Sequence, residues 1–128
     1  MAAEIAKNLI KSANIKNINT DSAGLCASQG EPAAFNAKLA MKEIGLDISY
    51  HTSKSIKSEE IKSIDYFFVM SSYHKEMIEL AGIKSEKIII LGDGISDPYG
   101  EGIEIYRICR NQLVSAIKKA LKEVGIIE

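Results

Sequence analysis

Apolar residues recur every three or four positions along much of this chain, and that spacing predicts helices. In the first segment Ile5, Leu9 and Ile10 face one way, while charged residues occupy the other positions. Pro32 suits the first turn of a second helix, and Ser72 can cap a later one. The helices predicted in this way cover residues 1–13, 32–44, 58–61, 72–80 and 103–124.

Three short apolar runs alternate with these helices and predict strands. They are Ile18 to Ala23, Tyr66 to Met70 and Ile88 to Leu91. Strands that alternate with helices pair in parallel and are covered by helices on both faces. The predicted fold is therefore α/β, a three-layer sandwich around a small parallel sheet. Doubly wound domains usually begin with a strand that becomes the centre of the sheet, whereas this chain opens on a helix.

Three of the predicted helices end in the same way. Gly45, Gly82 and Gly125 each follow the last apolar-periodic residues and are each followed by Leu or Ile. Glycine readily adopts the left-handed conformation that ends a helix, and the next apolar residue can then fold back onto the last turn. The three glycines therefore mark three helix boundaries.

The length of the chain predicts one domain over residues 1–128. Its charge balance predicts no strongly charged surface. The chain carries 16 basic and 17 acidic side chains, and its net charge of −1 gives no attraction to nucleic acid or an anionic membrane. No apolar run approaches the roughly 20 residues that span a bilayer. The first residues lack the pattern of a signal peptide. Two cysteines make no disulfide framework, so we expect a cytoplasmic location.

An Asp-Pro-Tyr-Gly sequence, Asp97 to Gly100, follows the last predicted strand. Open α/β sheets hold their ligands at the carboxyl ends of their parallel strands. A carboxylic acid there can protonate a leaving oxygen, and partial burial by Tyr99 would help to keep it protonated. The same four residues are also typical of a type I turn with no chemical role. The tetrapeptide alone leaves both interpretations open.

Cysteines and histidines supply few further candidates. Cys26 follows a predicted strand, and Cys109 lies between two arginines in the last helix. Neither has the positive, amide-rich setting that a reactive thiolate needs, so we interpret both as ordinary cysteines. His51 lies in a polar loop and could position another group, whereas His74 is expected to be a solvated helix residue. No His or Cys has the spacing of a zinc site, and we expect no metal or cofactor.

Several short motifs follow one another along the chain in a fixed order. They are Asp21-Ser22-Ala23-Gly24, Gly30-Glu31-Pro32-Ala33, Gly45-Leu46-Asp47-Ile48 with His51, Asp65-Tyr66 before Phe67-Phe68-Val69-Met70, Asp97-Pro98-Tyr99-Gly100, and Tyr106 with Cys109. In order and spacing they resemble the low-molecular-weight protein tyrosine phosphatases. The resemblance covers nearly all of the chain and implies the fold of that family.

The resemblance also implies a chemistry, the hydrolysis of a phosphomonoester through a cysteinyl-phosphate intermediate. The Asp of the Asp-Pro pair is the general acid in that family, and the aromatic residue after the Pro lines the substrate cleft. These positions are Asp97 and Tyr99 here. Ser22 and His51 match residues that brace the phosphate loop by hydrogen bonds without touching the substrate. The implied substrate is a phosphorylated protein or a small phosphomonoester, with phosphotyrosine and phosphoarginine both open.

One part of the family pattern is missing from these 128 residues. Members open with a central strand and a Cys-x5-Arg phosphate loop that supplies the nucleophile. Six residues after Cys26 stands Pro32, and six after Cys109 stands Ser115, so no Cys-x5-Arg occurs. The resemblance therefore implies an N-terminally truncated domain that is inactive as it stands.

The missing strand and loop leave two structural outcomes and two other functions to consider. Residues 18–23 and 66–70 are expected to pair directly, or a second copy of the chain fills the gap as a homo-oligomer. A non-catalytic binding or assembly module on the same scaffold is the alternative function. A thiol-coupled arsenate reductase is disfavoured, because residues 66–81 contain no cysteine that could relay a disulfide.

Overall fold

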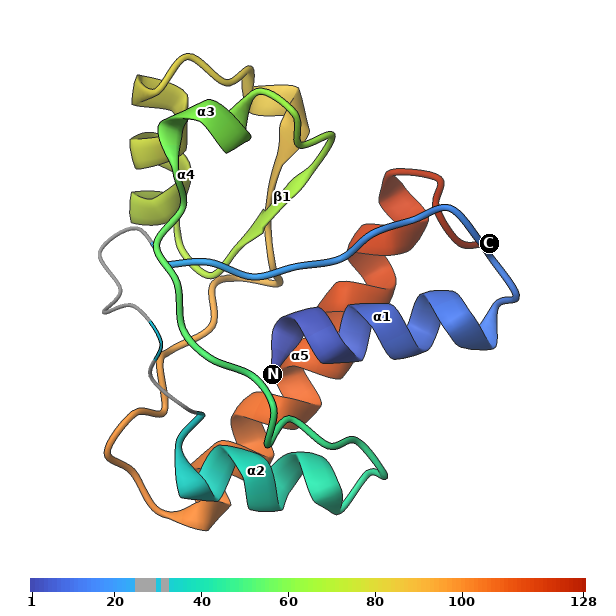
Figure 1. Cartoon of the computed structure of the whole chain (residues 1–128), viewed down its shortest axis with the longest axis vertical. Coiled ribbons are helices and arrows are strands. Elements are labelled where there is room, and N and C mark those ends of the chain that lie inside the picture. The colour runs from blue at the N-terminus through green and yellow to red at the C-terminus, as the bar shows by residue number, and fades with distance from the viewer. Residues whose placement is uncertain (25–29, 31–32) are drawn as a thin grey trace.

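The structure of the protein is a computed structural model that describes residues 1–24, 30 and 33–128. From α2 onward its elements follow the predicted order of helices and strands (Figure 1). In chain order they are α1 (Ala2–Ser12), α2 (Phe35–Lys42), α3 (Ser58–Ile61), β1 (Phe67–Val69), α4 (Ser72–Leu80), the 3-10 turn η1 (Ser85–Lys87), β2 (Ile88–Ile90) and α5 (Ile103–Glu123).

The sheet consists of β1 and β2, which run parallel with Phe67 opposite Ile88 and Val69 opposite Ile90. Alternate residues of a strand point to opposite faces. Phe67 and Val69 pack with Ile78 of α4, whereas Phe68 packs against the larger core built on α1, α2 and α5. Helices therefore cover both faces of a parallel sheet, which confirms the predicted α/β class.

The predicted strand at Ile18–Ala23 does not form. Only Gly24 makes a bridge, parallel to Ser55, in which its N–H donates to the Lys54 carbonyl at 2.8 Å. Among the described residues the backbone of Phe67–Val69 pairs with β2 alone, so the predicted direct pairing with residues 18–23 is wrong. The segment carries Asn19 and Asp21, which strands disfavour, and Asn17 just before it turns the chain at a φ of +67°, so both composition and backbone work against a strand.

The predicted helix ends are confirmed. Gly45, Gly82 and Gly125 have φ angles of +79°, +95° and +76°. The N–H of Leu46 donates to the Met41 carbonyl at 3.0 Å, which closes the last turn of α2 as expected for a left-handed glycine cap. The start of α4 differs from the prediction by one residue, because the Ser71 hydroxyl, and not that of Ser72, accepts the N–H of His74 at 3.3 Å.

The core side of α5 also differs from the simplest interpretation of its periodicity. The helical spacing of Ile105, Ile108, Val114, Ile117 and Leu121 predicts one apolar stripe, but Ile105 and Ile108 are 44% and 54% exposed. The buried row consists of Tyr106, Cys109, Leu113, Ile117, Ala120 and Leu121. That row faces α1 and α2. Packing against these helices therefore determines which of two adjacent apolar rows of α5 is buried.

In the described part of the chain, no helix is both long enough and apolar enough to cross a membrane.

Candidate functional site

Asp97 lies seven residues after Ile90, where β2 ends, in the loop that leaves the carboxyl end of the parallel sheet. The Asp97 carboxylate is exposed, and its Oδ1 accepts the N–H of Tyr99 at 3.0 Å. The N–H of Glu101 donates to the Pro98 carbonyl at 2.9 Å, which closes the turn. The backbone turn therefore spans Pro98 to Glu101, one residue later than the predicted turn, and the Asp97 side chain caps its start; the role of Asp97 as a general acid stays a prediction.

Two buried residues of α5 support this loop from below. The thiol of Cys109 lies 3.9 Å from the Ser96 carbonyl, to which it donates a weak hydrogen bond. The phenol of Tyr106, which is buried, interacts electrostatically with the loop at Asp97 and Gly100. Burial, and then the nearby Asp97 carboxylate, raise the pKa of Tyr106, so its phenol stays neutral. Both residues act on the loop as packing and hydrogen-bonding supports.

Cys109 is the one cysteine among the described residues, and its surroundings argue against a nucleophile. It is only 5% exposed. Burial, and to a smaller extent Asp97, raise the pKa of the thiol, opposed by the positive N-terminus. A thiol with a raised pKa is protonated at neutral pH and reacts poorly. The interpretation of Cys109 as an ordinary cysteine is therefore supported, while Cys26 lies outside the described residues.

Ser22 and His51 belong to a second group of polar residues. The N–H of Ser22 donates to Asp21 Oδ1 at 2.8 Å, and the same carboxylate forms an ion pair with Lys54. The hydrogen bond from Lys54 lowers the pKa of Asp21, and His51 adds a smaller effect in the same direction. The described residues show no hydrogen bond from Ser22 or His51 to Asp97. Their predicted bracing of a phosphate loop stays a prediction.

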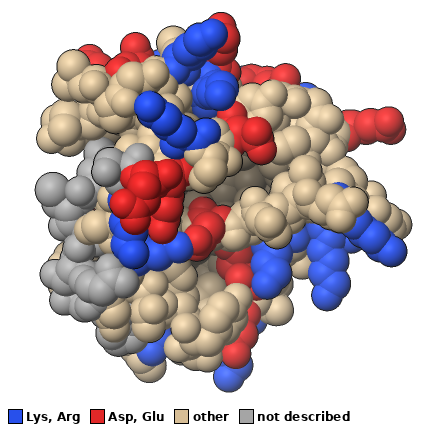
Figure 2. All heavy atoms as spheres, turned by 45° about the horizontal axis from the view of Figure 1, so that its top comes forward, with Lys and Arg blue, Asp and Glu red and all other residues tan. Residues whose placement is uncertain are grey.

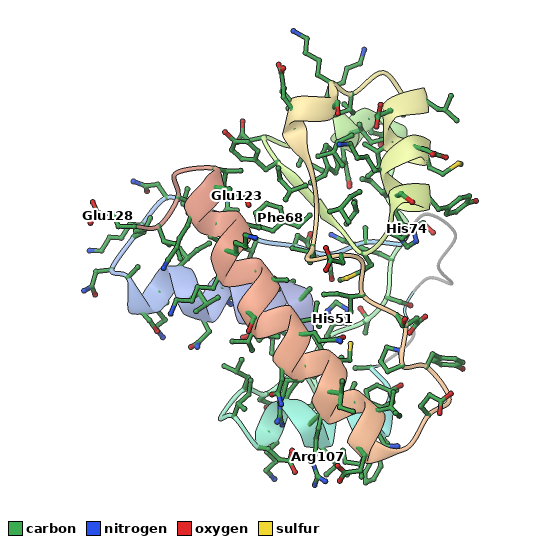
Figure 3. The ribbon with its side chains drawn as sticks, turned by 180° about the vertical axis from the view of Figure 1, so that it is seen from behind. His51, Phe68, His74, Arg107, Glu123 and Glu128 are labelled. Atoms are coloured by element: carbon green, nitrogen blue, oxygen red, sulfur yellow. The ribbon has the colours of Figure 1, made fainter. Side chains whose placement is uncertain are left out.

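The amino end of α1 lies between the two groups. The hydroxyl of Tyr50, next to His51, donates to Glu4 Oε2 in the first turn of α1 at 2.5 Å. The α-amino group of Met1 interacts electrostatically with Cys109, below the Asp97 loop, and burial lowers its pKa. Figure 3 shows His51 beside this end of α1. The candidate residues therefore gather around a helix N-terminus, where backbone N–H groups and the helix dipole favour an anion.

The remaining features of the site are a hollow in the surface, the search for metal ligands, and His74. Figure 2 shows a hollow in the middle of one face, with side chains of both charges at its rim. In the part of the chain that the structure describes, no cluster of His, Cys, Asp or Glu could hold a metal ion. His74 is half-buried and 2.9 Å from the Ser71 hydroxyl, so it stabilises the start of α4 instead of being solvated.

The sequence did not predict two contacts that join α2 and the residue after it to the Asp97 loop and to α5. The side-chain amide of Asn36 donates to the Glu101 carbonyl at 3.1 Å. Glu43 accepts hydrogen bonds from Arg107 and Arg110, two arginines that the sequence alone could have assigned to phosphate binding. The partners lie more than 60 residues apart, and neither contact leaves a periodic or motif signal in the sequence.

This fold and site define a class, an α/β domain that presents a carboxylic acid beside a helix N-terminus at the end of a parallel strand. The family described as "Low molecular weight phosphotyrosine protein phosphatase" matches residues 1–126. The chain belongs to this family, as the resemblance in sequence implied.

Individual relatives agree with this assignment. The protein-arginine-phosphatase of Geobacillus stearothermophilus is 31% identical over 94% of this chain and 86% of its own length. The low molecular weight protein-tyrosine-phosphatase Ptp of Acinetobacter johnsonii is 35% identical over 59% of this chain and 52% of its own. Among solved structures, the low molecular weight protein tyrosine phosphatase from T. tengcongensis superposes with a TM-score of 0.86 at 28% identity, covering 95% of this chain and 88% of that one.

Proposed function

We propose that the site of this chain belongs to a phosphomonoester hydrolase in which Asp97 is the general acid. The observation that carries the proposal is the position of the Asp97 carboxylate, exposed on a fixed loop beside the amino end of α1. In this proposal a phosphate binds at the amino end of α1. The carboxyl group of Asp97 then donates a proton to the oxygen of the leaving group. Tyr99, which is 80% exposed, lines the approach to the site and contacts the group that the phosphate leaves.

Ser22 and His51 have a supporting role in this proposal. His51 follows Tyr50, whose hydroxyl donates to Glu4 in the first turn of α1, and both His51 and Ser22 interact with the Asp21 carboxylate. Their side chains would hold a phosphate-binding segment by hydrogen bonds without contacting the substrate. Such support fixes the groups that touch the substrate in the geometry that catalysis requires.

We also propose that the 128-residue chain does not turn over substrate by itself. It contains no Cys-x5-Arg, and its one described cysteine near Asp97 has a raised pKa. Phosphoryl transfer depends mostly on positioning the phosphate and stabilising its charge. A general acid contributes only about 10²–10⁴-fold, and only where a nucleophile and charge stabilisation are already present.

An assay with p-nitrophenyl phosphate, phosphotyrosine peptide and phosphoarginine tests both statements. The purified chain is expected to release phosphate no faster than buffer from all three. If the wild-type chain does release phosphate and Asp97→Asn does not, Asp97 is the general acid and the proposal that the chain is inactive is wrong. Turnover that Asp97→Asn leaves unchanged would contradict the assignment of Asp97 as well.

The three substrates also address specificity. Relatives of this chain are named as arginine phosphatases and as a tyrosine phosphatase. The two substrate classes share a phosphate on a flat, delocalised group, and both can lie against an exposed aromatic ring such as Tyr99. We therefore propose a phosphorylated protein side chain as the substrate class, with small phosphomonoesters as the competing outcome; binding of the three compounds measured by calorimetry, which needs no turnover, separates the two.

A non-catalytic assembly role is the second candidate, and the free side of β1 favours it. In the described residues the backbone of Phe67–Val69 has partners on the β2 side alone. A second copy of the chain could satisfy the other side by adding a strand. Sedimentation equilibrium over a hundredfold range of protein concentration is expected to show a dimer, and a monomer throughout would contradict this second proposal.

A further inference from the structure

Two N–H groups of the Asp97 loop donate to acceptors within the loop itself. The N–H of Tyr99 donates to Asp97 Oδ1 at 3.0 Å, and that of Glu101 to the Pro98 carbonyl at 2.9 Å. From α5, the thiol of Cys109 donates a weak hydrogen bond to the Ser96 carbonyl at 3.9 Å, and the buried phenol of Tyr106 interacts electrostatically with Asp97 and with the backbone of Gly100. The beginning and the middle of the loop are therefore held by contacts within the loop and by α5.

The end of the loop is held by a different element. The side-chain amide of Asn36 donates to the Glu101 carbonyl at 3.1 Å, across 65 residues of sequence. Asn36 lies in the first turn of α2, immediately after Phe35 begins the helix. The amide therefore links the start of α2 to the last residue of the turn that carries Asp97.

Helix α2, from which Asn36 makes this contact, is itself held in place by α5. Arg107 of α5 holds Glu43 of α2 with its Nε 3.0 Å from Oε1 and its second terminal nitrogen 2.7 Å from Oε2. Arg110 donates to the Ala40 carbonyl at 2.8 Å, and Ala40 itself is fully buried. Two arginines of α5 therefore hold the carboxyl end of α2, and the buried Ala37, next to Asn36, packs the start of the helix into the core.

We propose that Asn36 is a positioning residue for the Asp97 loop. Its amide closes the loop against α2, while Tyr106 holds the same loop against α5, so that the carboxylate is fixed from both helices. The role in positioning a general acid rests on the function proposed above for Asp97. The mechanical part, a loop held by one side-chain amide, does not depend on that function.

Amide hydrogen exchange measured by NMR tests the proposal on the full chain. In Asn36→Ala the N–H groups of Tyr99, Gly100 and Glu101 are expected to exchange about two- to tenfold faster, the effect of losing one hydrogen bond that closes a loop. The N–H of Leu91, which donates to the Val69 carbonyl within the sheet, is expected to exchange at the wild-type rate.

Two further variants separate positioning from helix stability. Asn8→Ala changes another exposed asparagine in a helix, α1, and is expected to leave the three loop amides unchanged. Asn36→Gln keeps an amide donor on a side chain one methylene longer and is expected to restore part of the slow exchange. Restoration by the amide is a result that a purely structural role of α2 would not give.

Three results would overturn the proposal. They are loop exchange in Asn36→Ala that equals that of Asn8→Ala, faster exchange of Leu91 together with the loop, and Asn36→Gln exchanging as fast as Asn36→Ala. Phosphatase assays are read separately from these rates. Failure of the proposed function therefore leaves the exchange result intact, and failure of the exchange result leaves the role of Asp97 untouched.

Discussion

Glu43 shows how a single residue can matter through partners that are distant in sequence. Its carboxylate accepts hydrogen bonds from Arg107 and Arg110, and these lower its pKa from the ordinary 4.5 to about 2. A carboxylate whose pKa is lower in the folded state stabilises the fold above its unfolded pKa, and this stabilisation is lost as the pH falls through the folded value.

The pH dependence of Glu43→Gln follows from that sign. The variant is expected to have a lower Tm than the wild type between pH 5 and 7, because the neutral amide loses the charge-assisted bonds to both arginines. The difference in Tm should shrink as the pH falls below about 4.5 and become small once the pH is below about 2, where most of the wild-type carboxylate is also protonated.

Thermal unfolding followed by circular dichroism at a series of pH values measures this difference. Glu76→Gln on the exposed side of α4 is the matched control and should follow the wild type throughout. A difference between Glu43→Gln and wild type that stays constant down to pH 2 would show that the ion pairs are not its cause.

At the scale of elements, the glycine caps explain why the helices end where they do. Gly45 has a φ of +79° after α2, and no atom lies within 4 Å of the position that a Cβ would occupy. A substitution there meets no steric contact, so its whole cost comes from the left-handed backbone. That cost is roughly 1–2 kcal/mol for a residue with a Cβ.

Gly45→Ala is therefore expected to lower the free energy of unfolding by about 1 kcal/mol. Gly102→Ala is the control, because Gly102 has a φ of −75° and equally open surroundings. It should change the free energy of unfolding by less than about 0.5 kcal/mol. Urea unfolding of both variants measures the difference, and equal losses would mean that the left-handed conformation is not what costs energy at Gly45.

At the scale of the whole molecule, one large core joins α1, α2 and α5, and a smaller one lies between the sheet and α4. Ile117 is 1% exposed at the centre of the large core, while Ile108 on the same helix is 54% exposed. The two residues differ in burial and not in chemistry, which makes them a test of what the core contributes.

Ile117→Ala is expected to lower the free energy of unfolding by about 2–5 kcal/mol, because it removes a buried side chain and leaves a cavity. Ile108→Ala should lower it by less than about 1 kcal/mol. Guanidinium unfolding monitored by tyrosine fluorescence and circular dichroism measures both losses. Similar losses for the two variants would contradict the burial of α5 described above.

Much of the local structure could be predicted from the sequence. The helices, two of the three strands and the glycine caps follow from apolar spacing and from the backbone freedom of glycine, which act within a few residues. The strand at Ile18–Ala23 could not be predicted correctly, because a strand needs a partner, and apolar content at Ile18 does not supply one. The family and the candidate acid Asp97 were also accessible, since the motifs keep their order along the chain.

The sequence by itself determined which segments are helical, where they stop and which carboxylate follows the last strand. Tertiary structure alone decided which apolar row of α5 is buried, that Arg107 and Arg110 bind Glu43, and that Asn36 closes the Asp97 loop. The reason is physical. Helix periodicity and turn chemistry depend on neighbours within about four residues, whereas these contacts join groups more than 60 residues apart that only the packed helices bring together.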